Sequence, residues 1–487
     1  MTTRASGVRL NWPSSDVVAL ISMIALAVLA RGQTFGNPVL GYDEQFYLLM
    51  GDRMLHGDMP YVDVFDRKPV GLFLIFAAIL ALGGDGFVQY KVVASLFAAI
   101  TGYFIFRVSR PVSNGVAARV AGAMYILWLN LMEGFGGQAQ VFYNLPVLLA
   151  AFFTWRALQD GSAIGRLGCG AMLSMGIAIQ IKYTAVFEGL FFGVALLWAH
   201  RKSGARPATR ALAASLWIGL ALLPTAAAAL FYYGVGEFSL FFFANVTSNL
   251  GRPPVPRAAQ LGGLAEIIAL LAPLMLLALP NIRTATMRFV ALWAAVAFGG
   301  MLAFGSFLSS QYGMNVIAPL CIAASPSFAS ARYGRWLGVA VLSVALAAGQ
   351  LIIDRVTKLK GGAEVAALLT RYATPRQGCL YVYSGFPALY MLTHSCLPTR
   401  WAFPDHLSTL GEASAQAIGV DPSTELRRIL STRPETIVDS YPAFAFGNPQ
   451  THAILKQALA ERYRLVARIP IGSSNERLVY RLRSTIR

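Results

Sequence analysis

The chain has 487 residues, of which 56% are hydrophobic and only 13% are charged, and its mean hydropathy is +0.56. A soluble domain usually carries about 25% charged residues, so this composition excludes an ordinary soluble protein. Apolar segments of about 20 residues recur along the chain and predict a mainly α-helical, polytopic membrane protein. The formal net charge of +17 does not predict nucleic acid as a partner, because no soluble segment presents a basic face with interleaved aromatic residues.

Hydropathy divides the chain into two parts. We expect residues 1–353 to form a transmembrane domain with about eleven spans, and residues 354–487 to form a small domain outside the membrane. The first apolar segment is interpreted as an uncleaved span rather than a signal peptide, because the chain after it is also membrane-embedded. The expected spans are 14–31, 87–107, 116–133, 141–156, 166–181, 184–199, 211–232, 261–280, 287–306, 311–326 and 335–353.

A further apolar segment, residues 69–83, has about 15 residues, which is short for a full crossing. If it does not cross, all the basic loops fall on the cytoplasmic side, as the positive-inside rule requires. If it crosses, every basic cluster moves outside. We therefore expect a cytoplasmic N-terminus, a first outer loop over residues 32–86, and a C-terminal domain on the outer side. The basic loops are 107–119, 156–166, 200–210, 281–288 and 332–335.

In residues 354–487, short β-rich runs alternate with helical patterns, which predicts a small α/β domain. The expected strands are CLYVYS, TIVDSY, RLVARIP and LVYRLR, and the expected helices are STELRRILSTR and THAILKQALAERY. Cys379 and Cys396 both lie in this domain and can pair if it is outside the cytoplasm. The sequence leaves this pairing open.

Residues 41–71 form the one long polar stretch that precedes the second expected span, with six acids and three bases. Asp43 and Glu44 stand side by side near its start. Ionisable groups at membrane level are costly and are functional candidates. Apolar surroundings raise the pKa of a carboxyl group and make it a better proton acceptor, so both residues are predicted to be catalytic. For Glu44 the alternative is that it caps the helix that follows.

Five residues are candidates for holding a phosphate on the outer side. Lys68 stands where the chain turns apolar again, Arg67 precedes it, and Lys182 interrupts an apolar stretch between two expected spans. A compact ammonium charge suits a phosphate. Arg252 lies in a long outer loop, and Tyr312 opens a late span. The alternatives are snorkelling lysines, a solvated loop and an ordinary interfacial tyrosine.

Polar side chains also gather at the outer end of the third and fourth expected spans, where Glu133, Gln138, Tyr143 and Asn144 can bind sugar hydroxyls. Helix capping and hydrogen bonds between helices explain this cluster equally well. No Cys/His grouping has the spacing of a zinc site and no nucleotide-binding loop occurs. The residues therefore give no support for a nucleotide-dependent mechanism or a zinc site.

Three dipeptides lie in register within one outer loop: Asp43-Glu44, Pro60-Tyr61 and Lys68-Pro69. With these motifs the chain resembles the GT-C membrane glycosyltransferases. It is most similar to the bacterial branch that includes relatives of the protein O-mannosyltransferases and the lipid A aminoarabinose transferase. That branch has a D-E pair, a P-Y or similar step and then K-P-P-L, which opens a short apolar helix.

The chain departs from this pattern at several positions. The run after Lys68 reads K-P-V-G, so Val70 replaces the second proline of the branch. The branch often has an acid where this chain has Asn144, and a His-Tyr pair where it has Gln311 and Tyr312. Of that pair, only the tyrosine carries over.

The resemblance implies a polyprenyl-phosphate-sugar donor and an acceptor hydroxyl on an envelope lipid, glycan or protein. Asp43 would be the general base of an inverting transfer, and Lys68 and Lys182 would stabilise the departing phosphate. Tyr61 would contact the sugar or the acceptor. No metal or other cofactor is expected, because side-chain cations can neutralise the leaving group. The composition, rich in Ala, Arg and Gly with few lysines, favours a bacterial inner membrane with a periplasmic C-terminal domain.

Two other classes of function remain as alternatives. A transporter or flippase of lipid-linked sugars predicts charges buried in the middle of spans, whereas the acids here lie in a loop beside the first span. A non-catalytic membrane partner would keep the fold without turnover. The departures at Val70 and Asn144 keep this second alternative open.

Overall fold

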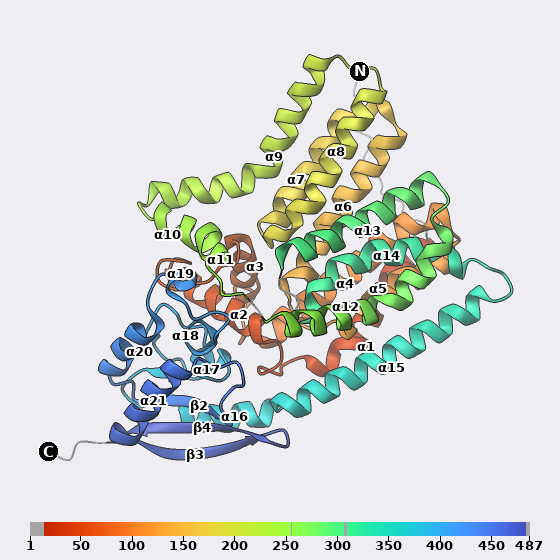
Figure 1. The fold of residues 1–487 in the computed structure, drawn as a ribbon. Coiled ribbons are helices and arrows are strands. Elements are labelled where there is room, and N and C mark those ends of the chain that lie inside the picture. Colours follow the sequence, from red (N-terminus) through yellow and green to blue (C-terminus); the bar gives the residue numbers. More distant parts are fainter. Residues whose placement is uncertain (1–13, 255, 306–308, 484–487) are drawn as a thin grey trace, which may run out of the picture.

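The protein is described by a computed structural model that covers residues 14–254, 256–305 and 309–483. The expected cytoplasmic N-terminus, residues 1–13, lies outside the described residues. The chain forms a large helical bundle followed by a small α/β domain, which lies at one end of the bundle (Figure 1). The helices of the bundle are α1 (Ser14–Arg31), α4 (Phe87–Ser109), α5 (Gly115–Leu131), α6 (Ala139–Gln159), α7 (Ile164–Ile179), α8 (Val186–Lys202), α9 (Pro207–Gly234), α12 (Arg257–Ala278), α13 (Ala285–Phe304), α14 (Ile317–Ala324) and α15 (Gly334–Lys360).

The described parts of the chain contain 9 helical segments that are long and apolar enough to cross a membrane. Helix α5, with 17 residues, falls just short of that length. The span expected over 311–326 is irregular: α14 has 8 residues and lies between 3₁₀ turns at Ser310–Val316 and Ser325–Phe328. The polytopic helical fold is therefore confirmed. Residues 311–326 form a shorter α-helix than the hydropathy predicted, with 3₁₀ turns on both sides.

Two shorter helices, α2 (Tyr42–Leu55) and α3 (Val70–Leu80), lie between α1 and α4. Helix α3 has 11 residues and is about 16 Å long, roughly half the thickness of the hydrocarbon core. The two helices approach closely at Gly51, where an added Cβ would lie 2.7 Å from the Ala77 backbone nitrogen. As a straight helix, α3 is too short to cross the membrane, as its sequence predicts.

Ion pairs join the start of α1 to the end of α4. Asp16 pairs with Arg107 at 2.6 Å and with Arg110 at 3.2 Å. These two helices therefore run in opposite directions through the bundle. The segment between them, with α2 and α3, leaves and re-enters the bundle at the same end.

The long connection between α9 and α12 was expected to be a loop, but much of it is helical. Helix α10 (Phe238–Phe242), a π-helical turn (Phe243–Thr247) and α11 (Ser248–Leu250) follow one another along it. Asn245 shows how the irregular turn is held, because its side-chain amide donates to the Phe241 backbone oxygen at 2.8 Å. This connection lies beside the C-terminal domain, near α19 (Figure 1).

Helix α15 leads from the bundle into the C-terminal domain (Figure 1), and it continues past residue 353 to Lys360. The predicted α/β pattern is confirmed, with a four-stranded sheet in the order β1-β2-β4-β3. β1 and β2 are parallel, whereas β4 pairs antiparallel with both β2 and β3. The elements are α16 (Ala363–Ala373), β1 (Leu380–Val382), α17 (Ala388–Leu392), α18 (Asp405–Ser408), α19 (Ala415–Ile418), α20 (Pro422–Ser431), β2 (Thr436–Tyr441), α21 (Pro449–Arg462), β3 (Tyr463–Ile471) and β4 (Asn475–Leu482).

Cys379 and Cys396 form a disulfide, which resolves the pairing that the sequence left open. It joins the start of β1 to the loop after α17. Backbone contacts also dock the domain on the first loop, since the Phe65 amide donates to the Arg400 carbonyl at 2.8 Å. The C-terminal domain is therefore packed directly on residues 32–86.

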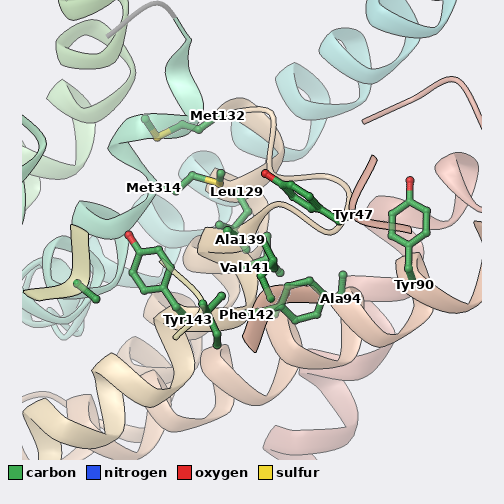
Figure 2. Close-up of a cluster of buried hydrophobic side chains, with 14 of the residues drawn as sticks. Tyr47, Tyr90, Ala94, Leu129, Met132, Ala139, Val141, Phe142, Tyr143 and Met314 are labelled. Atoms are coloured by element: carbon green, nitrogen blue, oxygen red, sulfur yellow. The ribbon is translucent and has the colours of Figure 1, made fainter. Parts of the chain in front are cut away.

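A cluster of buried aromatic and aliphatic side chains supports this end of the bundle. Figure 2 shows Tyr47, Tyr90 and Phe142 among its members. The ring of Phe76 in α3 lies 5.5 Å from that of Tyr47 and 5.9 Å from that of Phe142. Edge-to-face pairs of this kind fix ring orientation as well as burying apolar area. The cluster thus holds α2, α3, α4 and α6 in one rigid platform.

Candidate functional site

A polar cavity of about 180 Å³ lies between the bundle and the C-terminal domain. Its bundle side, which we call the membrane wall, comes from the connections between helices at one end of the bundle. The opposite side, the domain wall, consists of Phe403, Asp405, His406 and Glu412. The membrane wall consists of Asp43, Phe46, Tyr47, Asp66, Arg67, Lys68, Pro69, Gln138, Ala139, Gln140, Lys182, Tyr183, Thr184, Asn249, Arg252, Phe304, Gln311 and Tyr312.

Asp43 stands in the first turn of α2, where the helix dipole favours a negative charge. Its half-buried carboxylate accepts a hydrogen bond from the Tyr47 hydroxyl at 3.4 Å. Among the described residues it forms no other hydrogen bond and no ion pair, so its remaining lone pairs face the cavity. It is thus free to accept a proton from a bound molecule.

Asp66 is a second carboxylate in the same wall, and it is buried. Burial raises its pKa, an effect that the positive charge of Lys68 opposes. Its side chain accepts a hydrogen bond from the Arg67 backbone amide, which fixes the turn before α3. The sequence placed Asp66 in the acidic loop without giving it a role.

Glu44 does not line the cavity but lies behind it, completely buried. One carboxylate oxygen is 3.3 Å from the side-chain nitrogen of Gln138, and the other has no partner in the part of the chain described here. The backbone of Gly136 passes so close that an added Cβ would lie 2.7 Å from this second oxygen. Burial, and then the charge of Asp43, raise the pKa of Glu44 to about 8, so it is largely protonated at neutral pH.

Two lysines line the same wall of the cavity as Asp43. The Lys182 ammonium lies 4.9 Å from the ring centroid of Tyr312, and the Lys68 ammonium lies 5.7 Å from that of Tyr47. Such contacts orient a cation without neutralising it. Neither lysine forms an ion pair with any described residue. Burial, together with the charge of Lys68, lowers the pKa of Lys182 to about 7, whereas the charge of Asp43 opposes this fall.

Arg67 and Arg252 are held differently, since both bind the carboxylate of Glu412. Arg67 is buried and also donates to the Ser248 hydroxyl at 2.6 Å. Burial and the neighbouring Arg252 charge lower the pKa of Arg67 to about 9. These contacts tie the first loop, the α11–α12 connection and the C-terminal domain together. Both arginines therefore have a carboxylate partner in this state, unlike the two lysines.

The domain wall brings two further ionisable groups to the cavity. Asp405 accepts a hydrogen bond from the Tyr42 hydroxyl at 2.9 Å, and burial raises its pKa to about 6. The His406 ring packs against those of Phe65 and Phe403, with centroids 5.1 and 5.3 Å away. Burial, then the charge of Arg67, lowers the pKa of His406, so its ring is neutral at pH 7. No sequence motif pointed to these residues, which lie far along the chain from the first loop.

Of the residues predicted from sequence, the structure brings seven together in the cavity lining: Asp43, Arg67, Lys68, Gln138, Lys182, Arg252 and Tyr312. Four others that the sequence assigned to sugar or acceptor binding do not line it. Tyr61 is buried and donates to the Lys68 backbone oxygen at 2.7 Å, so it shapes the turn that carries the lysine.

Glu133, Tyr143 and Asn144 also lie away from the cavity lining. Glu133 accepts a hydrogen bond from the Ser309 hydroxyl at 2.8 Å. Asn144 is buried and donates to the Tyr125 hydroxyl at 3.1 Å and to a backbone oxygen. Tyr143 is buried in the cluster of Figure 2. The Asn144 contact with Tyr125 is a hydrogen bond between helices, as the alternative interpretation of this cluster expected.

Part of the chain that contains these cavity residues matches a known protein family. A family model described as dolichyl-phosphate-mannose-protein mannosyltransferase matches residues 67–242, which include Arg67, Lys68 and Lys182. No curated protein gives a significant match. The matched part is a little over a third of the chain.

Two solved structures share the architecture of almost the whole chain. ArnT from Cupriavidus metallidurans bound to undecaprenyl phosphate is 16% identical, with a TM-score of 0.59, and the match covers 96% of this chain and 98% of that one. ArnT from the same organism in the apo state gives a TM-score of 0.61 at the same identity and coverage. At this identity the likeness shows the fold. The chain is therefore a polytopic membrane protein with the GT-C glycosyltransferase fold, as its sequence predicted.

Proposed function

We propose that the protein transfers a sugar from a polyprenyl-phosphate donor to a hydroxyl group of a cell-envelope acceptor. The observation that carries this proposal is the pairing of a free carboxylate with two unneutralised cations in one cavity. Asp43 is available to accept a proton, and Lys68 and Lys182 are available to hold a phosphate. The family match and the GT-C fold support the same chemistry.

An apolar groove beside the cavity suits the lipid part of such a donor. It has a volume of about 650 Å³ and is lined mainly by α3, α9 and the end of α2 with the turn after it, together with Ile177, Gln180 and Ile181 at the end of α7. It reaches Val70 and Gly71, directly after the Lys68-Pro69 step that lines the polar cavity. A polyprenyl chain in this groove would leave its phosphate at Lys68. ArnT, which has the same fold, has been solved with undecaprenyl phosphate bound.

The transfer would proceed as an inverting displacement. Asp43 takes the proton of the acceptor hydroxyl as its oxygen bonds to the anomeric carbon. The bond from that carbon to the phosphate oxygen breaks, and its electron pair leaves with the polyprenyl phosphate. Lys68 and Lys182 stabilise the charge that develops there, where burial strengthens each interaction. Glu44, kept largely protonated, holds the Gln138 side chain in place without adding a second charge beside Asp43.

The proposed orientation places the cavity on the outer face of a bacterial inner membrane. The cavity residues and the C-terminal domain share one end of the bundle, and the basic loops fall at the other end. The disulfide between Cys379 and Cys396 supports an oxidising compartment for that domain. Exposed cysteines at Asp85→Cys and Ser203→Cys, on opposite ends, would test this. An impermeant reagent outside the cell should label the first and spare the second; the reverse pattern would contradict the orientation.

Release of polyprenyl phosphate is the product common to every acceptor, so it tests the proposed reaction directly. Purified protein in proteoliposomes would receive radiolabelled polyprenyl-phosphate sugars together with envelope lipids and glycans extracted from the native host. We expect acceptor-dependent release of polyprenyl phosphate and transfer of label to one acceptor class. If no donor is consumed with any extract, while the protein is folded, the proposed function is wrong.

A further inference from the structure

A second cavity, also of about 180 Å³, lies within the C-terminal domain. It opens at the end of β2, where the loop before α21 carries exposed aromatic side chains. It has no part in the displacement proposed above. Its lining consists of Tyr383, Ser384, Ser408, Asp439, Ala443, Phe444, Gly447, Asn448, Pro449 and His452.

The polar groups of this cavity are arranged around a buried carboxylate. Asp439 is 5% exposed, and its only side-chain polar partner among the described residues is His452, at 3.5 Å. The His452 ring is stacked on that of Tyr383, with centroids 6.0 Å apart and planes 11° from parallel. Asn448 uses its side-chain oxygen to cap α21 at the Gln450 amide, which leaves its nitrogen able to donate. Buried carboxylates normally have several hydrogen-bond donors, so this one has capacity for a ligand.

An aromatic ring stands beside these polar groups. Phe444 lines the cavity and is 58% exposed. The neighbouring Phe446 is 54% exposed and does not line the cavity; its ring packs edge-on against that of Phe444, with centroids 5.9 Å apart. A flat apolar surface next to a carboxylate, an imidazole and an amide suits a molecule with an apolar face and a rim of hydroxyls. A pyranose has this shape. The charge of Asp439 disfavours phosphate or another anion.

The second cavity lies close to the catalytic one, because the short helix α18 contributes residues to the linings of both. Asp405 and His406 at the start of this helix face the catalytic cavity, and Ser408 at its end lines the second. Three helical steps correspond to about 5 Å along the axis. Two hydrogen bonds fix this helix against the cavity. The Thr451 hydroxyl donates to the Leu407 carbonyl at 3.0 Å, and the backbone amide of Asn448 donates to the Ser408 carbonyl at 2.7 Å.

We propose that this second cavity is a saccharide-binding subsite, which holds one sugar residue of the acceptor while the acceptor hydroxyl lies in the catalytic cavity. The sugar face stacks on Phe444, and its hydroxyls donate to Asp439 and accept from the Asn448 side-chain amide, with the His452 ring beside them. The acceptor is then a glycan or glycolipid with at least one sugar beyond the hydroxyl that reacts. This assignment rests on the proposed function, because it identifies the bound sugar as part of the acceptor.

The binding test uses full-length protein in a detergent without a sugar headgroup. Saturation-transfer NMR would be recorded with methyl glucoside, methyl mannoside, glucosamine and N-acetylglucosamine as probes, on the wild type, Phe444→Ala, Asp439→Asn and the matched control Phe446→Ala. We expect the wild type and the control to bind at least one probe, and the other two variants to bind it at least roughly fivefold more weakly. Phe444→Ala loses an aromatic contact, and Asp439→Asn loses a charged hydrogen-bond acceptor. If no probe binds, or all four proteins bind equally, the subsite does not exist.

A second measurement separates this inference from the proposed function. Release of polyprenyl phosphate would be followed in the same four proteins as acceptor concentration is varied. We expect a raised KM for acceptor in Phe444→Ala and an unchanged one in Phe446→Ala. Normal release with equal KM values would overturn the subsite and leave the function intact. Probe binding that depends on Phe444, without release from any protein, would show a sugar site and overturn the transferase instead.

Discussion

The two walls of the polar cavity differ in how much of their charge is compensated. On the membrane wall, Asp43, Lys68 and Lys182 carry charges without an ion-pair partner among the described residues. On the domain wall, Glu412 is bound by two arginines and Asp405 is hydrogen-bonded to Tyr42. Unpaired charges near a membrane are costly and persist where a ligand needs them. We therefore propose that the unpaired charges of the membrane wall carry the chemistry, whereas Glu412 and its two arginine partners dock the domain.

The largest effect should come from the carboxylate of the membrane wall. We expect Asp43→Asn to lower the rate of sugar transfer by at least about 10²-fold, because a general base contributes about 10²–10⁴-fold. Donor binding should remain, since the lysines are untouched. The matched control is Glu44→Gln, whose carboxyl group is already largely protonated. Equal losses in the two variants, measured as polyprenyl phosphate released, would remove Asp43 from its assigned role.

The protonation of Lys182 should make the transfer rate depend on pH, which can be compared between the wild type and Lys182→Arg. Its lowered pKa, about 7, means that it is charged below this pH and neutral above it. As pH rises from about 6 to about 8, the charged fraction falls about tenfold, so kcat/KM for donor should fall by a similar factor. Lys182→Arg stays charged over this range and should lose that alkaline decline. A decline that persists in Lys182→Arg would assign it to Asp405, Glu44 or another group.

Glu412 tests whether the domain wall is mainly structural. Glu412→Gln removes the carboxylate that binds Arg67 and Arg252, and leaves Arg67 buried without that partner. Breaking such a pair is costly, so we expect a lower midpoint of thermal unfolding and a donor KM raised by a few-fold at most. Glu476→Gln, in the exposed pair with Arg468, is the control and should change stability by less than about 1 kcal/mol. A loss of kcat comparable to that of Asp43→Asn would give the domain wall a catalytic part.

The smallest expected effect concerns metal ions. The proposal assigns charge neutralisation to lysine side chains, so EDTA should leave the transfer rate unchanged. The measurement is release of polyprenyl phosphate before and after chelation, with added Mg²⁺ or Mn²⁺ as the reversal. If EDTA lowers the transfer rate and either ion restores it, a metal ion stabilises part of the phosphate charge that we assign to Lys68 and Lys182.

The membrane wall was largely predictable from sequence, and the domain wall was not. Asp43, Lys68 and Lys182 are charges that interrupt apolar stretches, and topology alone brings them to one side of the membrane. Asp405, His406 and Glu412 lie in the C-terminal domain, where a charged residue does not interrupt a long apolar stretch and so is not conspicuous. Only the packing of that domain on the first loop brings them to the cavity. The sequence also does not show which buried polar side chains reach the cavity: nothing local distinguishes Asn144, which is bonded to Tyr125 inside the bundle, from the cavity residue Gln138.

The most direct test of the catalytic assignment is a structure of the Asp43→Asn variant with an intact polyprenyl-phosphate sugar. We predict the phosphate between the ammonium groups of Lys68 and Lys182, and the lipid chain in the apolar groove lined mainly by α3, α9 and the end of α2 with the turn after it. The anomeric carbon should then face residue 43, with room for an acceptor oxygen between them. A phosphate bound away from both lysines, or a sugar facing away from residue 43, would contradict it.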